Sequence, residues 1–184
     1  MTPTEELSKE HEAILRMIGI LLKMAGRLET GEPVEPDDAD QAVEFIRVFG
    51  DKCHHGKEEG HLFPELEKAG LPRDRGPVAV MLAEHEEGRR FVEAMTRAVP
   101  GLRTGDQHAA AAFAAAARGY GDVLVQHIAK EDRVLFPMAA ARLTVEQQKR
   151  LEEAFETVEE TVVGGGRHEE FCRLLERLEK TYRI

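Results

Sequence analysis

The stretches HHGKEEGHLFP at residues 54–64 and HIAKEDRVLFP at residues 127–137 align with each other without a gap. In both stretches a histidine is followed four residues later by a glutamate, and both end in Leu-Phe-Pro. Upstream of each stretch the tripeptide Glu-His-Glu occurs once, at residues 10–12 and 84–86. A repeat of this kind indicates two copies of one structural unit. The sequence therefore predicts two helical hairpins with the same layout.

The apolar residues around these motifs recur at helical rather than alternating spacing. Apolar residues spaced three or four apart occur in four segments: residues 4–29, the segment after Pro36, residues 78–99 and residues 113–134. Strand signals are absent, so we predict an all-α fold: an up-down four-helix bundle built from two repeated hairpins, over residues 1–142. Residues 143–184 predict two further helices around the glycines at 164–166, a C-terminal helical extension that docks on the bundle. Pro64 and Pro137 are expected to end or kink their helices.

Composition limits the partners and the cellular compartment. The chain has 184 residues and a net charge of −10, and no segment concentrates lysine and arginine. We therefore expect neither nucleic acid nor an anionic membrane as a partner. The two cysteines, Cys53 and Cys172, form no CxxC motif, and no apolar signal region or long apolar run occurs. This pattern predicts a cytoplasmic protein, with a homodimer or a separate protein partner as open alternatives.

The repeated motif has the spacing of a metal site. Residues four apart lie on one face of a helix, so His54 and Glu58 can bind a common point, as can His127 and Glu131. Two like hairpins would bring four histidines and two glutamates together inside the bundle. Burying the carboxylates unpaired would cost several kcal/mol each, whereas a bound metal removes this cost. Imidazole and carboxylate donors together favour iron or manganese over magnesium.

The two His-x-x-x-Glu-x-x-x-Leu-Phe-Pro motifs, with one histidine on each preceding helix, resemble the haemerythrin-like family, also called the HHE cation-binding domain. The resemblance spans about residues 7–138. It implies two non-haem iron ions inside the bundle, bridged by carboxylates and by an oxo or hydroxo group. It also implies four terminal histidine ligands and two bridging glutamates: His11, His54, His85 and His127, with Glu58 and Glu131.

The chain departs from the pattern of the oxygen-carrying haemerythrins. Arg89 stands where those proteins have a second histidine, one turn after the third-helix histidine. They also use an aspartate five residues after the fourth-helix histidine, a position that is Asp132 here. The alignment of the two Leu-Phe-Pro segments favours Glu131 as the ligand, with Asp132 as the alternative.

The resemblance implies binding or sensing of dioxygen or nitric oxide, peroxide handling, or iron storage and delivery. Six protein ligands in place of seven leave more metal positions open, which favours reaction with a small oxidant over reversible oxygen carriage. We expect small gases or peroxide to reach a cavity lined by Ile14, Val92 and Leu124. The alternatives are iron storage, delivery or the repair of iron centres, a zinc or mononuclear site, and a metal-free helical interaction module.

The other four histidines are expected outside the ligand set. Counting 100° per residue from Ile46, the centre of its apolar stripe, His55 lies about 180° away and is predicted to face solvent. His61 lies about 60° from the same centre and is an alternative extra ligand. His108 and His168 lie beside loops and are predicted to be surface residues.

Overall fold

The computed structural model describes residues 1–164 and 166–184, and every regular element within these ranges is a helix. The predicted all-α class is confirmed. Gly165, one of the three glycines predicted to link the last two helices, lies outside the described residues. None of the described helices is long and apolar enough to cross a membrane.

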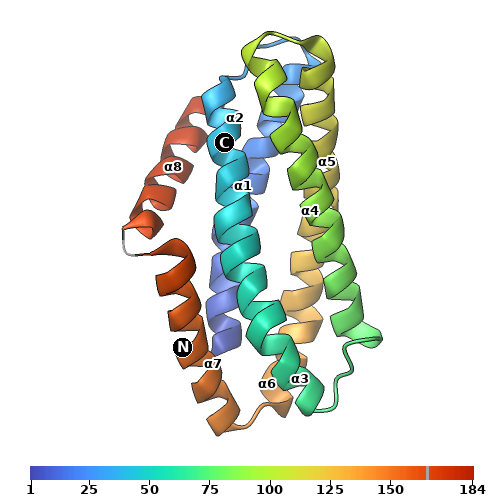
Figure 1. Ribbon diagram of the computed structural model, residues 1–184, viewed down its shortest axis with the longest axis vertical. Helices are drawn as coiled ribbons and strands as arrows, with labels where there is room; N and C mark the ends of the chain where they lie inside the picture. Colours follow the sequence, from blue (N-terminus) through green and yellow to red (C-terminus); the bar gives the residue numbers. More distant parts are fainter. Residues whose placement is uncertain (165) are drawn as a thin grey trace.

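Four long helical segments form the body of the molecule (Figure 1). The first segment is α1 (Pro3–Glu29), and the third is α4 (Gly76–Arg103). The second segment joins α2 (Pro36–Phe45), the π-helices η1 (Ile46–His55) and η2 (Glu58–Leu62), and α3 (Phe63–Lys68). The fourth joins α5 (Gln107–Lys130), the π-helix η3 (Glu131–Leu135) and α6 (Phe136–Arg142). Helix α5 packs against both α1 and α4. The repeated glutamates each begin a short π-helix: Glu58 begins η2, and Glu131 begins η3.

The two prolines of the repeat do not end their helices. Pro64 and Pro137 lie in the first turns of α3 and α6, and the helical path continues to Lys68 and Arg142. Each α-helix follows directly on a π-helix, whose i→i+5 hydrogen bonding is a wider turn than that of an α-helix. At the first turn of a helix, the missing N–H of proline costs little. The expectation that these prolines end the helices was therefore wrong.

The Leu-Phe pairs of the two motifs meet in one apolar cluster. Leu62, Phe63, Leu135 and Phe136 are all buried there, together with Leu7 of α1. A fully buried side chain of this size contributes roughly 1.5–3 kcal/mol to folding. The repeat therefore fixes the two hairpins against each other just below the polar part of the motif.

The C-terminal residues run along one side of the body, drawn orange and red in Figure 1. They form α7 (Val145–Val158), the π-helix η4 (Glu159–Val163) and α8 (Arg167–Tyr182). Helix α7 begins with a capping box between Thr144 and Gln147. These elements pack on α1, α2, η1 and η2, which all belong to the first hairpin. Arg177 of α8 binds Asp38 at 2.6 Å, an ion pair that joins the tail to α2.

Candidate metal centre

The six residues of the repeat lie together inside the bundle. Each is at most 1 % exposed, although all six are polar or charged. They come from four segments: α1, the π-helical part of the second segment, α4, and the junction of α5 with η3. These residues are His11, His54, Glu58, His85, His127 and Glu131.

The four histidines form two matched pairs. Nε2 of His11 lies 3.1 Å from Nε2 of His54, and Nε2 of His85 lies 3.1 Å from Nε2 of His127. Two nitrogen ligands about 2.1 Å from one ion, at a right angle to each other, are about 3.0 Å apart. Each pair therefore has the spacing of two neighbouring ligands on one ion. A proton or a metal ion must lie between the two nitrogens, because two unprotonated nitrogens would repel.

Glu131 lies between the two pairs. Its Oε2 atom is 3.2 Å from Nε2 of His11 and also 3.2 Å from Nε2 of His127. The carboxylate thus contacts one imidazole of each pair. This is the position that a bridging carboxylate needs.

Glu58, the repeat partner of Glu131, spans the pairs in the same way. Its oxygens lie 3.8 Å from Nε2 of His54 and 3.4 Å from Nε2 of His85. Among the residues that the structure describes, none of the four oxygens of Glu58 and Glu131 has a hydrogen-bond partner. A buried carboxylate left without partners costs several kcal/mol, and metal coordination removes that cost. The residues present therefore fit a bound metal.

The outer nitrogen of each histidine is held by a carboxylate. A carboxylate accepts, so each Nδ1–H donates and each Nε2 is turned to the centre. The four pairs are His11 with Asp132 at 3.0 Å, His54 with Glu10 at 2.8 Å, His85 with Glu59 at 2.7 Å, and His127 with Glu84 at 3.0 Å. The sequence offered Asp132 only as an alternative ligand, and this supporting role was not predicted for any of the four carboxylates. The repeat carried the signal, since both copies have a glutamate before the first histidine and an acidic residue after the bridging glutamate.

The electrostatics of the metal-free site favour protons on two imidazoles. Burial alone would lower the pKa of His11, but Asp132 and Glu131 outweigh it and raise this pKa to about 9. Burial is likewise outweighed at His85, where Glu58 and Glu59 raise the pKa to about 9. Burial disfavours the charge of Glu131, but His11 and His127 hold its pKa well below the usual range. Metal binding would therefore displace protons from this site.

The prediction that His55 faces solvent was wrong. His55 is 5 % exposed, and its ring stacks on that of His85 with centroids 3.8 Å apart. One ring nitrogen of His55 lies within 4.8 Å of donor atoms of Glu58, His85 and His127, all of which are likewise within that distance of one another. The prediction assumed 100° per residue from Ile46, but Ile46–His55 is a π-helix, whose wider turn changes the phase of every following residue.

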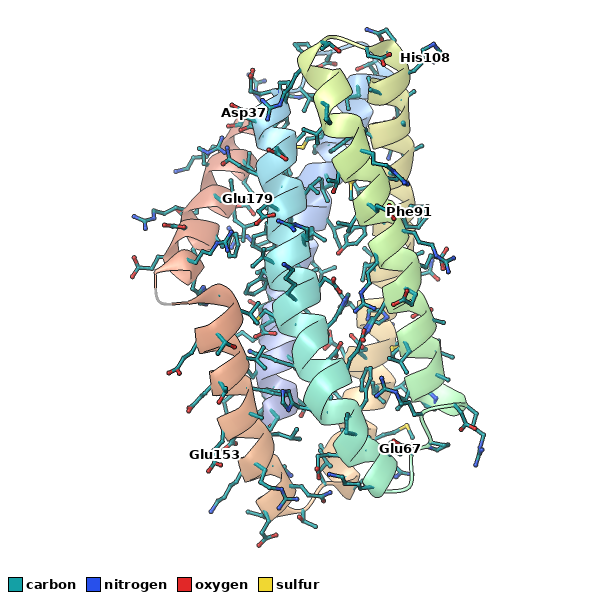
Figure 2. All side chains as sticks on the ribbon, viewed as in Figure 1. Asp37, Glu67, Phe91, His108, Glu153 and Glu179 are labelled. Carbon is teal, nitrogen blue, oxygen red and sulfur yellow. The ribbon has the colours of Figure 1, made fainter. Side chains whose placement is uncertain are left out.

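The alternative ligands of the sequence lie outside the centre. Asp132 accepts hydrogen bonds from Ser8 at 2.7 Å and from His11, so it supports an imidazole rather than bridging the pairs. His61 is half-buried against Phe155, with ring centroids 6.5 Å apart, and belongs to neither group of converging donors. His108, at the start of α5 (Figure 2), and His168 are exposed, as predicted.

Arg89 takes no part in the group of donors but borders it. Its Nε donates to Asp51 at 2.8 Å and its Nη2 donates to Glu59 at 2.7 Å. Glu59 in turn holds His85, so the arginine fixes a carboxylate that orients an imidazole. Arg89 thus supports the site indirectly. It occupies the position at which the resemblance to oxygen-carrying haemerythrins would imply a fifth histidine.

A pocket of about 360 Å³ opens beside this arginine, and its lining is mainly apolar. Val92 lines it as predicted, but Ile14 and Leu124 do not; Ile46, Gly88 and Tyr120 take their place. His55 also lines the pocket and so stands between it and the donors. A Cβ atom at Gly88 would meet Leu124 Cδ2 at 3.0 Å, which places Leu124 behind the glycine.

Comparison with known proteins matches the part of the chain that contains the six central residues. The family model described as the hemerythrin HHE cation binding domain matches residues 2–139. An uncharacterised protein of Mycobacterium tuberculosis is 27% identical over 159 residues, which cover 86% of this chain and 62% of that protein. The iron-sulfur cluster repair protein YtfE of Escherichia coli is 32% identical over 136 residues, 71% of this chain and 61% of that protein. The chain thus spans about three fifths of the length of these relatives. No solved structure matches the chain significantly.

Proposed function

Because the chain belongs to the hemerythrin HHE cation-binding domain family, we propose that it holds two non-haem iron ions and reacts with or senses small oxidants. One ion would lie at each histidine pair, and Glu58 and Glu131 would bridge them. The observation that carries the proposal is the set of four buried carboxylate oxygens without hydrogen-bond partners, placed between two converging imidazole pairs.

The donors favour iron or manganese over magnesium or calcium. Imidazole nitrogen is a borderline donor that binds iron, zinc and copper, whereas carboxylate oxygen alone would suit magnesium or calcium. Bridging carboxylates between two ions inside a helical bundle are typical of di-iron and di-manganese proteins. When bound, iron supplies the electrons for reduction of a small oxidant. The chain itself holds the imidazoles through their carboxylate partners and keeps the site free of bulk water.

The surroundings favour small, neutral reactants. The pocket beside Arg89 has a mainly apolar surface, to which Ile46, Val92 and Tyr120 contribute, and four charged residues also line it: Arg47, Asp51, Arg89 and Glu93. Dioxygen, nitric oxide and hydrogen peroxide fit such a pocket by size and polarity. We therefore expect the partner of the centre to be a gas or peroxide rather than a macromolecule.

Repair of iron–sulfur clusters is the second candidate. It is favoured by the 32% identity to a protein named for that function, over 71% of this chain. The same ligand set would serve either function, so the two are separated by the substrate and not by the metal. A damaged cluster protein whose activity returns on incubation with the iron-loaded chain would favour repair.

The test is metal analysis followed by reaction. Protein produced in iron-rich medium should hold about two iron ions per chain, and its reduced form should change its optical spectrum on exposure to dioxygen or peroxide. The variant Glu58→Ala should lose iron, whereas the control His61→Ala, on the same π-helix but facing Phe155, should keep it. An iron-free wild-type protein would instead support a helical interaction module, and two irons without any reaction would support storage or delivery.

A further inference from the structure

The pocket beside Arg89 is larger than a small oxidant requires. Its volume is about 360 Å³, whereas an apolar cavity of about 150 Å³ already holds a benzene molecule. A water molecule, which is close to dioxygen in size, takes up about 30 Å³ in the liquid. Sites for organic ligands have volumes of about 300–1,000 Å³ and mainly apolar walls with a few polar groups. The pocket therefore has the size of a site for a small organic molecule.

The charged side chains of this pocket leave no charge for a ligand to neutralise. Two arginines and two acidic residues line it, so their formal charges cancel. Each is bound to an oppositely charged side chain: Arg89 to Asp51, Arg47 to Glu44, and Glu93 to Arg97. A charged ligand would lose its water without gaining a free counter-ion, and such a transfer is unfavourable. The pocket therefore favours a neutral ligand.

The hydroxyl of Tyr120 is a polar group that such a ligand can use. This side chain lines the pocket and is 2 % exposed, yet its hydroxyl forms no hydrogen bond with any residue that the structure describes. The other tyrosine of the chain, Tyr182, is similarly buried, and its hydroxyl donates to Asp38 at 3.1 Å. Buried tyrosine hydroxyls ordinarily have such a partner. Burial also raises the pKa of Tyr120, so the hydroxyl keeps its proton and can donate it to a ligand.

We propose that this pocket binds a neutral, ring-sized organic molecule with one hydrogen-bonding oxygen, for which a small phenol is the simplest example, and that Tyr120 recognises the oxygen. The ring of the ligand would lie against the apolar surfaces of Ile46, Val92 and Tyr120. His55 also lines the pocket and stacks on His85, so one imidazole ring would separate the ligand from a proposed metal ligand. The inference does not rest on the proposed function, because none of its evidence involves a metal.

The test is a fluorine NMR titration of the full chain, first without metal, with three probes of similar shape. These are para-fluorophenol, para-fluorotoluene, which lacks the hydroxyl, and para-fluorobenzoate, which is charged. The wild type should bind para-fluorophenol saturably, and para-fluorobenzoate at least about tenfold more weakly because its charge must leave water. Tyr120→Phe should weaken the binding of para-fluorophenol by about three- to tenfold, the value of one hydrogen bond, and leave para-fluorotoluene unaffected.

Two further variants locate the probes. Tyr182→Phe is the matched control: it removes the other tyrosine hydroxyl and should leave both neutral probes at their wild-type affinities. Thr96→Trp places a large side chain at an exposed position of the pocket lining and should prevent saturable binding of both. Because Thr96 is exposed, this variant also decides the question if Tyr120→Phe fails to fold.

Several outcomes would overturn the proposal. They are absence of saturable para-fluorophenol binding, unchanged binding in Thr96→Trp, and equal para-fluorophenol affinity in Tyr120→Phe and the wild type. Tighter binding of para-fluorobenzoate would show a site for anions instead. The iron-loaded chain should give the same affinities, whereas a new charge-transfer band on adding the phenol would place the probe on the metal and contradict the pocket site. A chain that binds no iron would refute the proposed function but leave this inference standing.

Discussion

The two hairpins carry the same donors but are covered differently. Lys57 and Lys130 occupy the same position in the two motifs, and each binds the glutamate that supports the neighbouring imidazole. The side chain of Lys57 is fully buried, whereas that of Lys130 is 40% exposed. The difference comes from the tail, because Phe155 of α7 lies over the Lys57 ammonium at 5.5 Å. The copies thus agree in the six repeated residues and differ in how they pack against α7 and α8, whose main contacts are with the first hairpin.

The copies also differ on the inner side, at a few positions. Gly88 in the second hairpin corresponds to Ile14 in the first, and His55 in the first motif corresponds to Ile128 in the second. Both Gly88 and His55 line the pocket, and a Cβ atom at Gly88 would meet the side chains of Leu124 and Tyr120. A duplicated scaffold can thus keep its repeated histidines and glutamates while a few substitutions change what surrounds them in each half.

Removal of the tail should have the largest effect on stability. A chain ending at Arg142 loses several buried side chains, among them Leu151, Phe155 and Leu178, each worth roughly 1.5–3 kcal/mol. That sum is comparable with the whole stability of a typical domain, about 5–15 kcal/mol. We therefore expect a loss of several kcal/mol in the free energy of unfolding, measured by chemical denaturation of the metal-free protein.

Iron should still bind to the shortened chain where it folds. Within residues 143–164 and 166–184, no side chain belongs to the two groups of converging donors, and His168 and Glu169 are exposed. Iron loading should therefore partly restore the folded state, because a ligand that binds only the folded form stabilises it. A shortened chain that folds fully but retains no iron would show that the tail supplies a ligand.

Replacing the two equivalent lysines should separate the covered half from the exposed one. Glu10 and Glu6 raise the pKa of Lys57 even though its burial opposes this, so the ammonium stays charged beneath Phe155. Lys57→Met removes one partner of a buried ion pair, and we expect a destabilisation of about 3–5 kcal/mol. Lys130→Met removes a half-exposed pair and should cost about 0–1 kcal/mol. Thermal and chemical unfolding of both variants would measure this, and equal losses would contradict the covering role of the tail.

The six central residues were predictable because the repeat and the i,i+4 spacing depend only on sequence. The alignment of the two Leu-Phe-Pro segments predicted Glu131 over Asp132, and the structure places Glu131 among the imidazoles. His55 was not predictable from helical phase, since the phase was counted at α-helical pitch through a segment that is π-helical. The pocket was predicted from apolar seams, which identified Val92 but not Ile46, Gly88 and Tyr120, which also line it. The π-helical turn determines the direction of His55, and the volumes of the neighbouring side chains determine which residues line the pocket.

Weakening the carboxylates behind the imidazoles should test how far the halves differ at the metal. Glu10 holds His54 and Glu84 holds His127, at equivalent positions of the two copies. Glu10→Gln and Glu84→Gln should each lower the affinity for one ion, by about 10- to 100-fold for a position with two imidazoles. Each variant should leave the affinity for the other ion at its wild-type value. Competition with a calibrated chelator would measure both affinities, and unchanged affinities in both variants would contradict the supporting role of these carboxylates.

The smallest effect on stability is expected in a test of thiol reactivity, which compares one position between the two halves. Cys53 is fully buried beneath η4, and its counterpart Gln126 is exposed. Burial raises the pKa of Cys53 to about 12, so almost no thiolate is present at about pH 8, and a disulfide-exchange reagent cannot reach the sulfur.

In a Cys172→Ser background, which removes the exposed thiol of α8, Cys53 should react only on unfolding. Adding Gln126→Cys to that background should create one thiol that reacts at the rate of a free cysteine, with no loss of stability beyond about 0.5 kcal/mol because the site is on the surface. The ratio of the two rates measures how completely the tail covers the first hairpin and leaves the second open. Comparable rates at the two positions would mean that the tail detaches from the first hairpin often enough to expose Cys53. The tail would then protect the first hairpin no better than the second is protected without it.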